Sequence, residues 1–125
     1  MIALDTHVVV WLHAGETNRL PTEVLQRLES DRAVVCPMVK LELQYLMETG
    51  RIRYGGERIL ADLAADIGLT VCDHPFPPII QEALRMTWTR DPFDRIIASH
   101  AVSAGHSLAT KDEMILENCP VAIWR

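Results

Sequence analysis

The chain has 125 residues, of which 49% are hydrophobic and 23% are charged, and its formal net charge is −5. This length supports one domain with a sizeable core but not two, so we expect a single domain over residues 1–125. The acidic balance excludes a non-specific nucleic-acid coat protein, which would need a basic surface, but it does not exclude an enzyme that acts on nucleic acid.

The sequence predicts neither a signal peptide nor a membrane span. The first residues have no basic region and reach a charge at Asp5, unlike a secretory signal. No apolar run approaches the roughly 18 residues that a membrane span requires. Cys36, Cys72 and Cys119 form no Cys-x-x-Cys pair. We therefore expect free thiols in a reducing, cytoplasmic environment.

Short apolar segments alternate with helical patterns along the whole chain. The predicted strands are 2–4, 33–36, 69–72, 107–110 and 121–123. The predicted helices cover approximately residues 8–14, 21–31, 38–48, 57–67, 79–86, 92–104 and 112–116, and prolines or glycines mark several of their ends. This alternation predicts an α/β fold, a three-layer α/β/α sandwich with a central, mostly parallel sheet of four to five strands.

Two aspartates follow predicted strands closely. Asp5 comes directly after the strand 2–4, and Asp112 follows the strand 107–110 by one residue. In doubly wound sheets the functional crevice lies beyond the carboxyl ends of the strands. We therefore expect the two side chains to lie at the same edge of the sheet.

The helix 92–104 carries a third acid. Asp91 before Pro92 is typical of a helix N-cap followed by proline at the first helical position. Asp94 points toward the apolar side of this helix. The polar stripe, which we expect to be solvated, is formed by Arg95, Ser99 and Ser103.

Glu42 is the fourth acid in an unexpected position. The predicted solvated stripe of its helix runs elsewhere, through Lys40, Gln44 and Glu48. Its neighbours three and four residues away are apolar or aromatic: Met38, Val39, Tyr45 and Leu46. Glu42 is therefore predicted to lie in the middle of a buried face.

Each acid has an ordinary structural explanation when it is taken alone. Glu42 could extend to solvent or cap a neighbouring element, Asp5 and Asp94 could stabilise helix N-termini, and Asp112 could form a turn. Together they bring four carboxylates inward with no obvious buried base to match them. Such a group destabilises the fold unless a cation intervenes. Carboxylates without imidazole or thiolate suit Mg²⁺ or Mn²⁺, and the chemistry that follows is phosphodiester hydrolysis.

Four stretches in order along nearly the whole chain also resemble a PIN domain, most closely the VapC-type ribonuclease toxins of bacterial toxin–antitoxin pairs. The specific parts are Leu4-Asp5-Thr6-His7 and the run from Arg90 to Ala98, which contains Asp-Pro-Phe-Asp-Arg. Leu108 to Asp112 and a glutamate in the helix after the second strand, which is less specific alone, complete the resemblance.

The resemblance implies a PIN-like α/β/α sandwich and a metal-dependent endoribonuclease that uses Mg²⁺ or Mn²⁺ and cleaves RNA. It also implies a homodimer and inhibition by a cognate antitoxin protein. The acids that match the family's metal-binding and catalytic positions are Asp5, Glu42, Asp94 and Asp112. Residues at additional matching positions are Asp91, which we interpret chiefly as a helix cap, and the hydroxyl residues Thr6 and Thr110.

Other residues suggest weaker hypotheses. The five histidines lack a compact zinc spacing, and we expect His100 at the edge of the solvated stripe. Trp11, Trp88 and Trp124 are isolated in sequence, and isolated tryptophans serve packing more often than base stacking. The segments Leu46-Met47 and Ile59-Leu60 form a candidate dimer or antitoxin surface.

Two alternatives come from other classes. A phosphoacceptor signalling module of similar topology would use Asp5, Asp73 and Lys111, but Asp5 has no acidic neighbour in sequence, and this scheme leaves Glu42 and Asp94 unexplained. A phosphatase with an aspartate nucleophile would need a second aspartate where His7 stands. A catalytically inactive PIN-like binding module is the remaining alternative, against which the complete set of four acids argues.

Overall fold

The computed structural model describes all 125 residues and contains one five-stranded sheet. The strand order is β3-β2-β1-β4-β5 and every neighbouring pair is parallel. The strands are β1 (Ile2–Leu4), β2 (Ala33–Val35), β3 (Thr70–Val71), β4 (Ser107–Ala109) and β5 (Ala122–Ile123). The predicted parallel sheet is confirmed. The central strand β1 and its neighbour β4 are the ones that precede Asp5 and Asp112.

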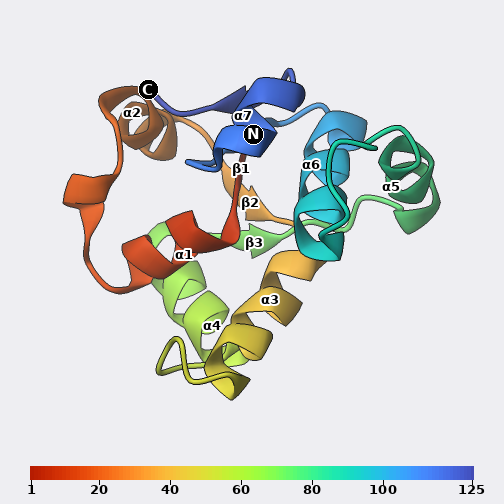
Figure 1. Cartoon of the computed structure of the whole chain (residues 1–125). Coiled ribbons are helices and arrows are strands. Elements are labelled where there is room, and N and C mark those ends of the chain that lie inside the picture. Colours follow the sequence, from red (N-terminus) through yellow and green to blue (C-terminus); the bar gives the residue numbers. More distant parts are fainter.

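Seven α-helices surround the sheet in Figure 1. They are α1 (Thr6–His13), α2 (Thr22–Ser30), α3 (Pro37–Glu48), α4 (Gly56–Ile67), α5 (Phe76–Ala83), α6 (Pro92–Ala104) and α7 (Glu113–Asn118), with a 3₁₀ turn η1 (Thr17–Arg19) before α2. Figure 1 shows α1 and α2 on one side of the sheet and α5 and α6 on the other. None of these helices has both the length and the apolar content that crossing a bilayer would require.

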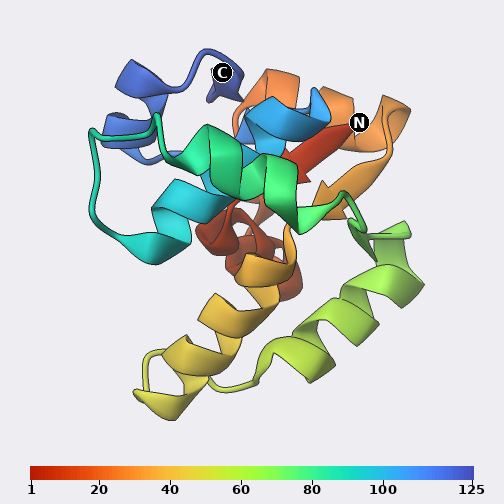
Figure 2. The same cartoon turned by 90° about the vertical axis from the view of Figure 1, so that its right-hand side faces the viewer.

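The helices α3 and α4 form a hairpin that projects from the body of the molecule (Figure 2). The helix α3 also contacts the amino-terminal part of the structure through α1 and packs against α6. Three elements that are distant in sequence, α1, α3 and α6, therefore meet at the edge where β1 ends.

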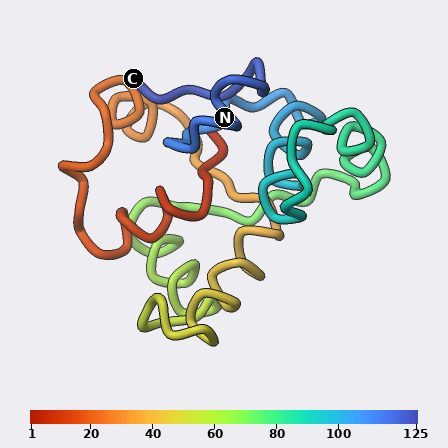
Figure 3. Tube along the Cα trace, in the orientation of Figure 1, coloured from red at the N-terminus to blue at the C-terminus, as the bar shows by residue number.

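The chain ends beside α2, as the trace in Figure 3 shows. The carbonyl oxygen of Arg125 accepts a hydrogen bond from the Val24 amide at 3.1 Å. Trp124 packs against the core. The last residues after β5 are thus fixed to the body of the fold.

Two predicted elements differ in extent or exposure from the structure. The helix predicted over 79–86 begins at Phe76 and ends at Ala83, because Pro77 and Pro78 fit the first helical turn, whose amides need no intrahelical partner. The strand predicted over 69–72 shortens to β3, and both residues of β3 are exposed because it is an edge strand.

Packing also overturns two predictions of exposed surface. Ile59 and Leu60 of α4 are only 3% and 7% exposed and belong to the hydrophobic core, so they form no docking surface. Ser99, predicted to be solvated, is fully buried, and its hydroxyl donates to the Arg95 carbonyl oxygen at 2.6 Å. Both corrections arise from neighbours that the helical pattern alone does not reveal, since α4 packs against α1 and α3, and α5 packs along α6.

His100 is fully buried in α6, which corrects its expected place at a solvated edge. Neither of its ring nitrogens has a hydrogen-bond partner. The rings of His74 and His106 lie 6.2 Å and 5.9 Å from its ring centre. Burial, together with these two histidines, lowers the pKa of His100 to about 4. His100 is therefore a neutral core residue at pH 7.

We expect His100 to make the fold acid-sensitive. Its folded pKa of about 4 lies below its ordinary value of 6.5. The unfolded state therefore binds more protons between these values, and the free energy of unfolding decreases as the pH falls through this range. His100→Leu removes this titration and the unpaired nitrogens. Urea unfolding at pH 7 and pH 5 should show a smaller loss of stability in the variant, and equal losses would contradict the prediction.

Candidate active site

Asp5 lies between the end of β1 and the start of α1. Its Oδ1 accepts a hydrogen bond from the Thr6 amide at 2.7 Å, as an N-cap does. The Asp5 amide donates to the carbonyl oxygen of Ala109 in β4 at 3.0 Å. Asp5 is only 3% exposed. Its carboxylate is therefore held in a fixed position at the carboxyl end of the sheet.

Thr110 links this carboxylate to the turn after β4. Its buried hydroxyl donates to Asp5 Oδ2 at 2.7 Å and accepts from the Asp112 amide at 3.1 Å. Asp112 is the N-cap of α7, because its Oδ1 accepts from the Ile115 amide at 3.0 Å. Asp5, Thr110 and Asp112 thus belong to one chain of hydrogen bonds.

Glu42 reaches the same place from α3. Its Oε1 accepts a hydrogen bond from the Thr6 hydroxyl. Burial raises the pKa of Glu42, the Thr6 bond opposes this rise, and the charges of Asp5 and Asp91 add to it. The prediction that Glu42 lies in the middle of a buried face is wrong in one respect. Its neighbour Tyr45 is 45% exposed, and Glu42 lines a cavity beside the core.

Asp91 and Asp94 belong to the start of α6. Asp91 is the N-cap, and its Oδ1 accepts from the amides of Phe93 and Asp94 at 2.9 Å and 3.1 Å. The half-buried Asp94 carboxylate has no hydrogen bond or ion pair within the chain. Burial raises the pKa of Asp94 to about 7, and the charges of Asp91, Asp5, Asp112 and Glu42 add to this rise. The negative charge of every other acid in the group therefore disfavours ionisation of Asp94.

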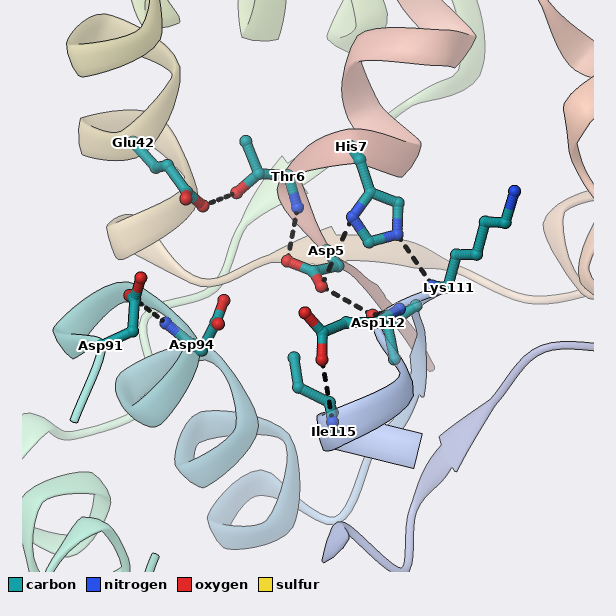
Figure 4. A network of polar contacts seen from close by, with 10 residues as sticks. Asp5, Thr6, His7, Glu42, Asp91, Asp94, Lys111, Asp112 and Ile115 are labelled. Carbon is teal, nitrogen blue, oxygen red and sulfur yellow. Dashed lines mark hydrogen bonds and ion pairs between the residues drawn. The ribbon is translucent and has the colours of Figure 1, made fainter. Parts of the chain in front are cut away.

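The acids line one cavity of about 400 Å³. Arg51 is the only lysine or arginine in its lining. Figure 4 shows the carboxyl groups of Asp5, Asp94 and Asp112 pointing toward a common space. The five carboxylates of the lining are Asp5, Glu42, Asp91, Asp94 and Asp112. This concentration of negative charge favours a cation in the cavity.

The donor chemistry of the cavity fits a hard divalent cation, because carboxylate oxygens are the ligands that Mg²⁺ and Mn²⁺ prefer. No three acidic, histidine or cysteine side chains stand close enough together to hold one ion as they are placed. The four carboxylates that the sequence suggested as metal ligands therefore do not converge within a single ion's reach. The Thr6 and Thr110 hydroxyls each bind one carboxylate oxygen in this arrangement, so enclosing an ion would require side-chain rotation.

His7 and Trp11 line the cavity as well, although the sequence prediction left them outside the site. His7 Nε2 accepts from the Lys111 amide at 2.8 Å, and Nδ1 lies 3.7 Å from Asp5 Oδ2. Burial lowers the pKa of His7, so the ring is neutral with its hydrogen on Nδ1. The available signal was its place two residues after Asp5.

The model of the PIN domain family matches residues 2–119, a span that contains all five acids of the cavity. The chain belongs to the PIN-domain family. This PIN domain is 30% identical over 132 aligned positions to ribonuclease VapC22 of Mycobacterium tuberculosis, and the alignment covers 98% of each chain.

Solved structures share the fold of this PIN domain. VapBC2 from Rickettsia felis, bound to a promoter DNA fragment, has a chain with a TM-score of 0.68 and 16% identity, covering 100% of this chain and 98% of that one. A toxin–antitoxin complex from Klebsiella pneumoniae has a TM-score of 0.64 and 16% sequence identity, and the match covers 98% of this chain and 96% of that one. DNA-bound VapBC from Salmonella typhimurium has a TM-score of 0.61 and 24% sequence identity, and the match covers 97% of this chain and 93% of that one.

We expect the Thr110 hydroxyl to stabilise the site of this PIN domain. Thr110→Val leaves Asp5 Oδ2 and the Asp112 amide without this partner, which should lower the free energy of unfolding by about 1–3 kcal/mol. Thr110→Ser keeps the hydroxyl and should lose less. Urea unfolding of the three proteins measures the difference, and a serine variant as unstable as the valine variant would contradict this role.

The raised pKa of Asp94 predicts a pH-dependent cost of folding in the metal-free protein. Between the ordinary value of 3.8 and the folded value of about 7, the folded state binds more protons than the unfolded state. Stability contributed by this group therefore decreases as the pH rises through that range. In EDTA, Asp94→Asn should be more stable than the wild type at pH 7.5, with a smaller advantage near pH 4.

The same variant tests for a bound cation. Mn²⁺ should raise the urea midpoint of the wild type at pH 7.5 and raise that of Asp94→Asn less, because binding to the folded state stabilises it. The exposed Asp66→Asn on α4 is the matched control and should respond like the wild type. In the EDTA comparison, a gain in the free energy of unfolding for Asp94→Asn that is the same at both pH values would contradict the pKa assigned to Asp94.

Proposed function

We propose that this PIN domain is a metal-dependent endoribonuclease that hydrolyses RNA phosphodiester bonds, and that it is the toxin of a type II toxin–antitoxin pair. The observation that carries the proposal is one cavity lined by five carboxylates and a single arginine at the carboxyl end of the sheet. The similarity to a ribonuclease over 98% of both chains supports the same reaction class.

In this proposal one or two Mg²⁺ or Mn²⁺ ions are held by Asp5, Glu42, Asp94 and Asp112. A cation held there would lower the pKa of an attacking water and neutralise the charge of the scissile phosphate. Thr6 and Thr110 are positioning residues, since their hydroxyls fix one oxygen each of Glu42 and Asp5.

The remaining acid, Asp91, has a structural task in this proposal. Both amides that it accepts from belong to the first turn of α6, so it directs the helix that carries Asp94. Asp94 itself has no competing hydrogen bond in the chain, and its carboxylate is therefore available to a ligand. Its raised pKa means that ion binding at neutral pH displaces a proton from this group.

The proposed partners are RNA, a cognate antitoxin and a second copy of this chain. The structural relatives include toxin–antitoxin complexes, which supports an antitoxin partner. A dimer is supported by large apolar side chains that are exposed on α3, on α5 and directly after α5, among them Leu41, Phe76 and Leu84. The three cysteines are free, which supports a reducing cytoplasm as the place of action.

The signalling-module alternative has less support. It requires Asp73 to act beside Asp5, but Asp73 lines a separate cavity with Cys36 and Cys72. It also gives no task to Glu42 and Asp94, which share the cavity of Asp5. The inactive-module alternative differs from the proposal only in the absence of chemistry, and a cleavage assay separates the two.

The test is cleavage of a structured RNA in the presence of Mn²⁺ or Mg²⁺. Asp94→Asn and Glu42→Gln each remove one proposed ligand charge, and each should reduce the rate by more than the roughly 10- to 100-fold that loss of an outer-shell partner costs. Glu48→Gln, an exposed position on the same helix as Glu42, is the matched control and should cleave like the wild type.

Undiminished cleavage by both ligand variants, with folding intact, would overturn the assignment of the site. A folded wild type that binds RNA and cleaves none with either ion would favour an inactive binding module. Rapid aspartyl labelling by acetyl phosphate would instead favour the signalling module.

A further inference from the structure

Three aromatic rings from opposite ends of the chain meet beside the acidic cavity. His7 and Trp11 come from α1, and Trp124 follows β5. The His7 ring centre lies 5.0 Å from that of Trp11 and 6.2 Å from that of Trp124, and the two tryptophan rings are 6.0 Å apart. We call His7, Trp11 and Trp124 the aromatic wall.

The aromatic wall is continuous with the cavity, because His7 and Trp11 also line the cavity that contains the carboxylates. Its position is fixed at both ends. The Lys111 amide donates to His7 Nε2 at 2.8 Å, and the Arg125 carbonyl oxygen accepts from the Val24 amide at 3.1 Å. Each ring of the wall is partly accessible. The wall is thus an ordered, partly exposed aromatic surface next to the acids.

Two cations stand over the wall. The Arg19 Cζ lies 5.2 Å and the Lys111 Nζ 5.9 Å from the Trp11 ring centre. Arg19 pairs with the exposed Glu16, and Lys111 has no ion pair. Cation–π contacts are weak at exposed sites, so either side chain can leave the ring for a stronger ligand.

A polyanion needs such a place to bind. The cavity itself carries five carboxylates against one arginine, so it repels phosphates wherever no metal ion neutralises it. Single-stranded nucleic acid is bound by aromatic faces that stack on bases together with cations that contact the backbone. The aromatic wall with Arg19 and Lys111 combines both features within reach of the cavity.

We propose that the aromatic wall is a stacking subsite for an unpaired RNA base next to the scissile phosphate, with Lys111 and Arg19 contacting the flanking phosphates. This inference rests on the proposed ribonuclease function and adds the residues that would bind a base beside the cut. The subsite acts through binding, whereas the carboxylates act in the reaction.

The first test is binding, which needs no cleavage. A fluorescein-labelled 12-nucleotide single-stranded RNA of mixed sequence is titrated with protein in Ca²⁺, and anisotropy gives the Kd. Trp11→Leu keeps apolar volume and removes the aromatic face, and it should weaken binding about tenfold. Trp11→Phe should restore most of the affinity. Trp88→Leu, a partly buried tryptophan outside the cavity lining, is the control.

The second test locates the base. A short RNA that the wild type cleaves is prepared with an abasic ribose at each position flanking the cut. One abasic position should lower wild-type kcat/KM about tenfold, mainly through KM. The same abasic position should have little further effect in Trp11→Leu, because the stacking partner is already absent. Trp124→Leu should behave like Trp11→Leu, and circular dichroism checks that both variants are folded.

The outcomes separate this inference from the proposed function. Unchanged RNA binding by folded Trp11→Leu and Trp124→Leu overturns the subsite even if the wild type cleaves RNA. Equal abasic effects in wild type and variants overturn it as well. If these variants lose affinity only for a protein partner, the wall belongs to that partner's interface. Wild type that binds the RNA through Trp11 but cleaves no RNA supports the subsite and contradicts the nuclease.

Discussion

The site depends on one constraint: five carboxylates lie in one cavity whose lining contains a single arginine. Asp5 is the fixed member of the group, since a backbone amide binds one of its oxygens and the Thr110 hydroxyl binds the other. Asp94 is the opposite case, because no group of the chain binds its carboxylate, and burial together with the surrounding acids raises its pKa. The residual repulsion between these carboxylates favours binding of a cation in the cavity.

The N-termini of three helices partly compensate for the repulsion between these carboxylates. Asp5, Asp91 and Asp112 are the N-caps of α1, α6 and α7, and Asp94 lies in the first turn of α6. Three helices therefore direct the positive ends of their dipoles toward one cavity. A strand order that places β1 beside β4 brings two of these helix starts together. Glu42, in the middle of α3, is the one acid held by a side chain alone.

The sequence predicted the features that depend on neighbouring residues along the chain, and it missed those that depend on packing between distant elements. Asp5 and Asp112 could be placed because each follows a strand, and parallel strands end at one edge. Asp91 could be assigned as a cap from the proline beside it. Nothing local could reveal that Ser99 and His100 are fully buried, or that Trp11 meets Trp124 from the other end of the chain. The spacing of the carboxylates was missed too, because it depends on how side chains from elements distant in sequence are placed.

The raised pKa of Asp94 has a consequence for the cation binding that we propose. At neutral pH this carboxyl is partly protonated in the metal-free chain, so a proton and a divalent cation compete for the same oxygen atoms. The apparent affinity for the ion then depends on pH, and each loading event releases acid to the solvent. In the proposed metal-dependent enzyme, mild acidification would therefore inhibit cation binding competitively, with the proton as the inhibitor.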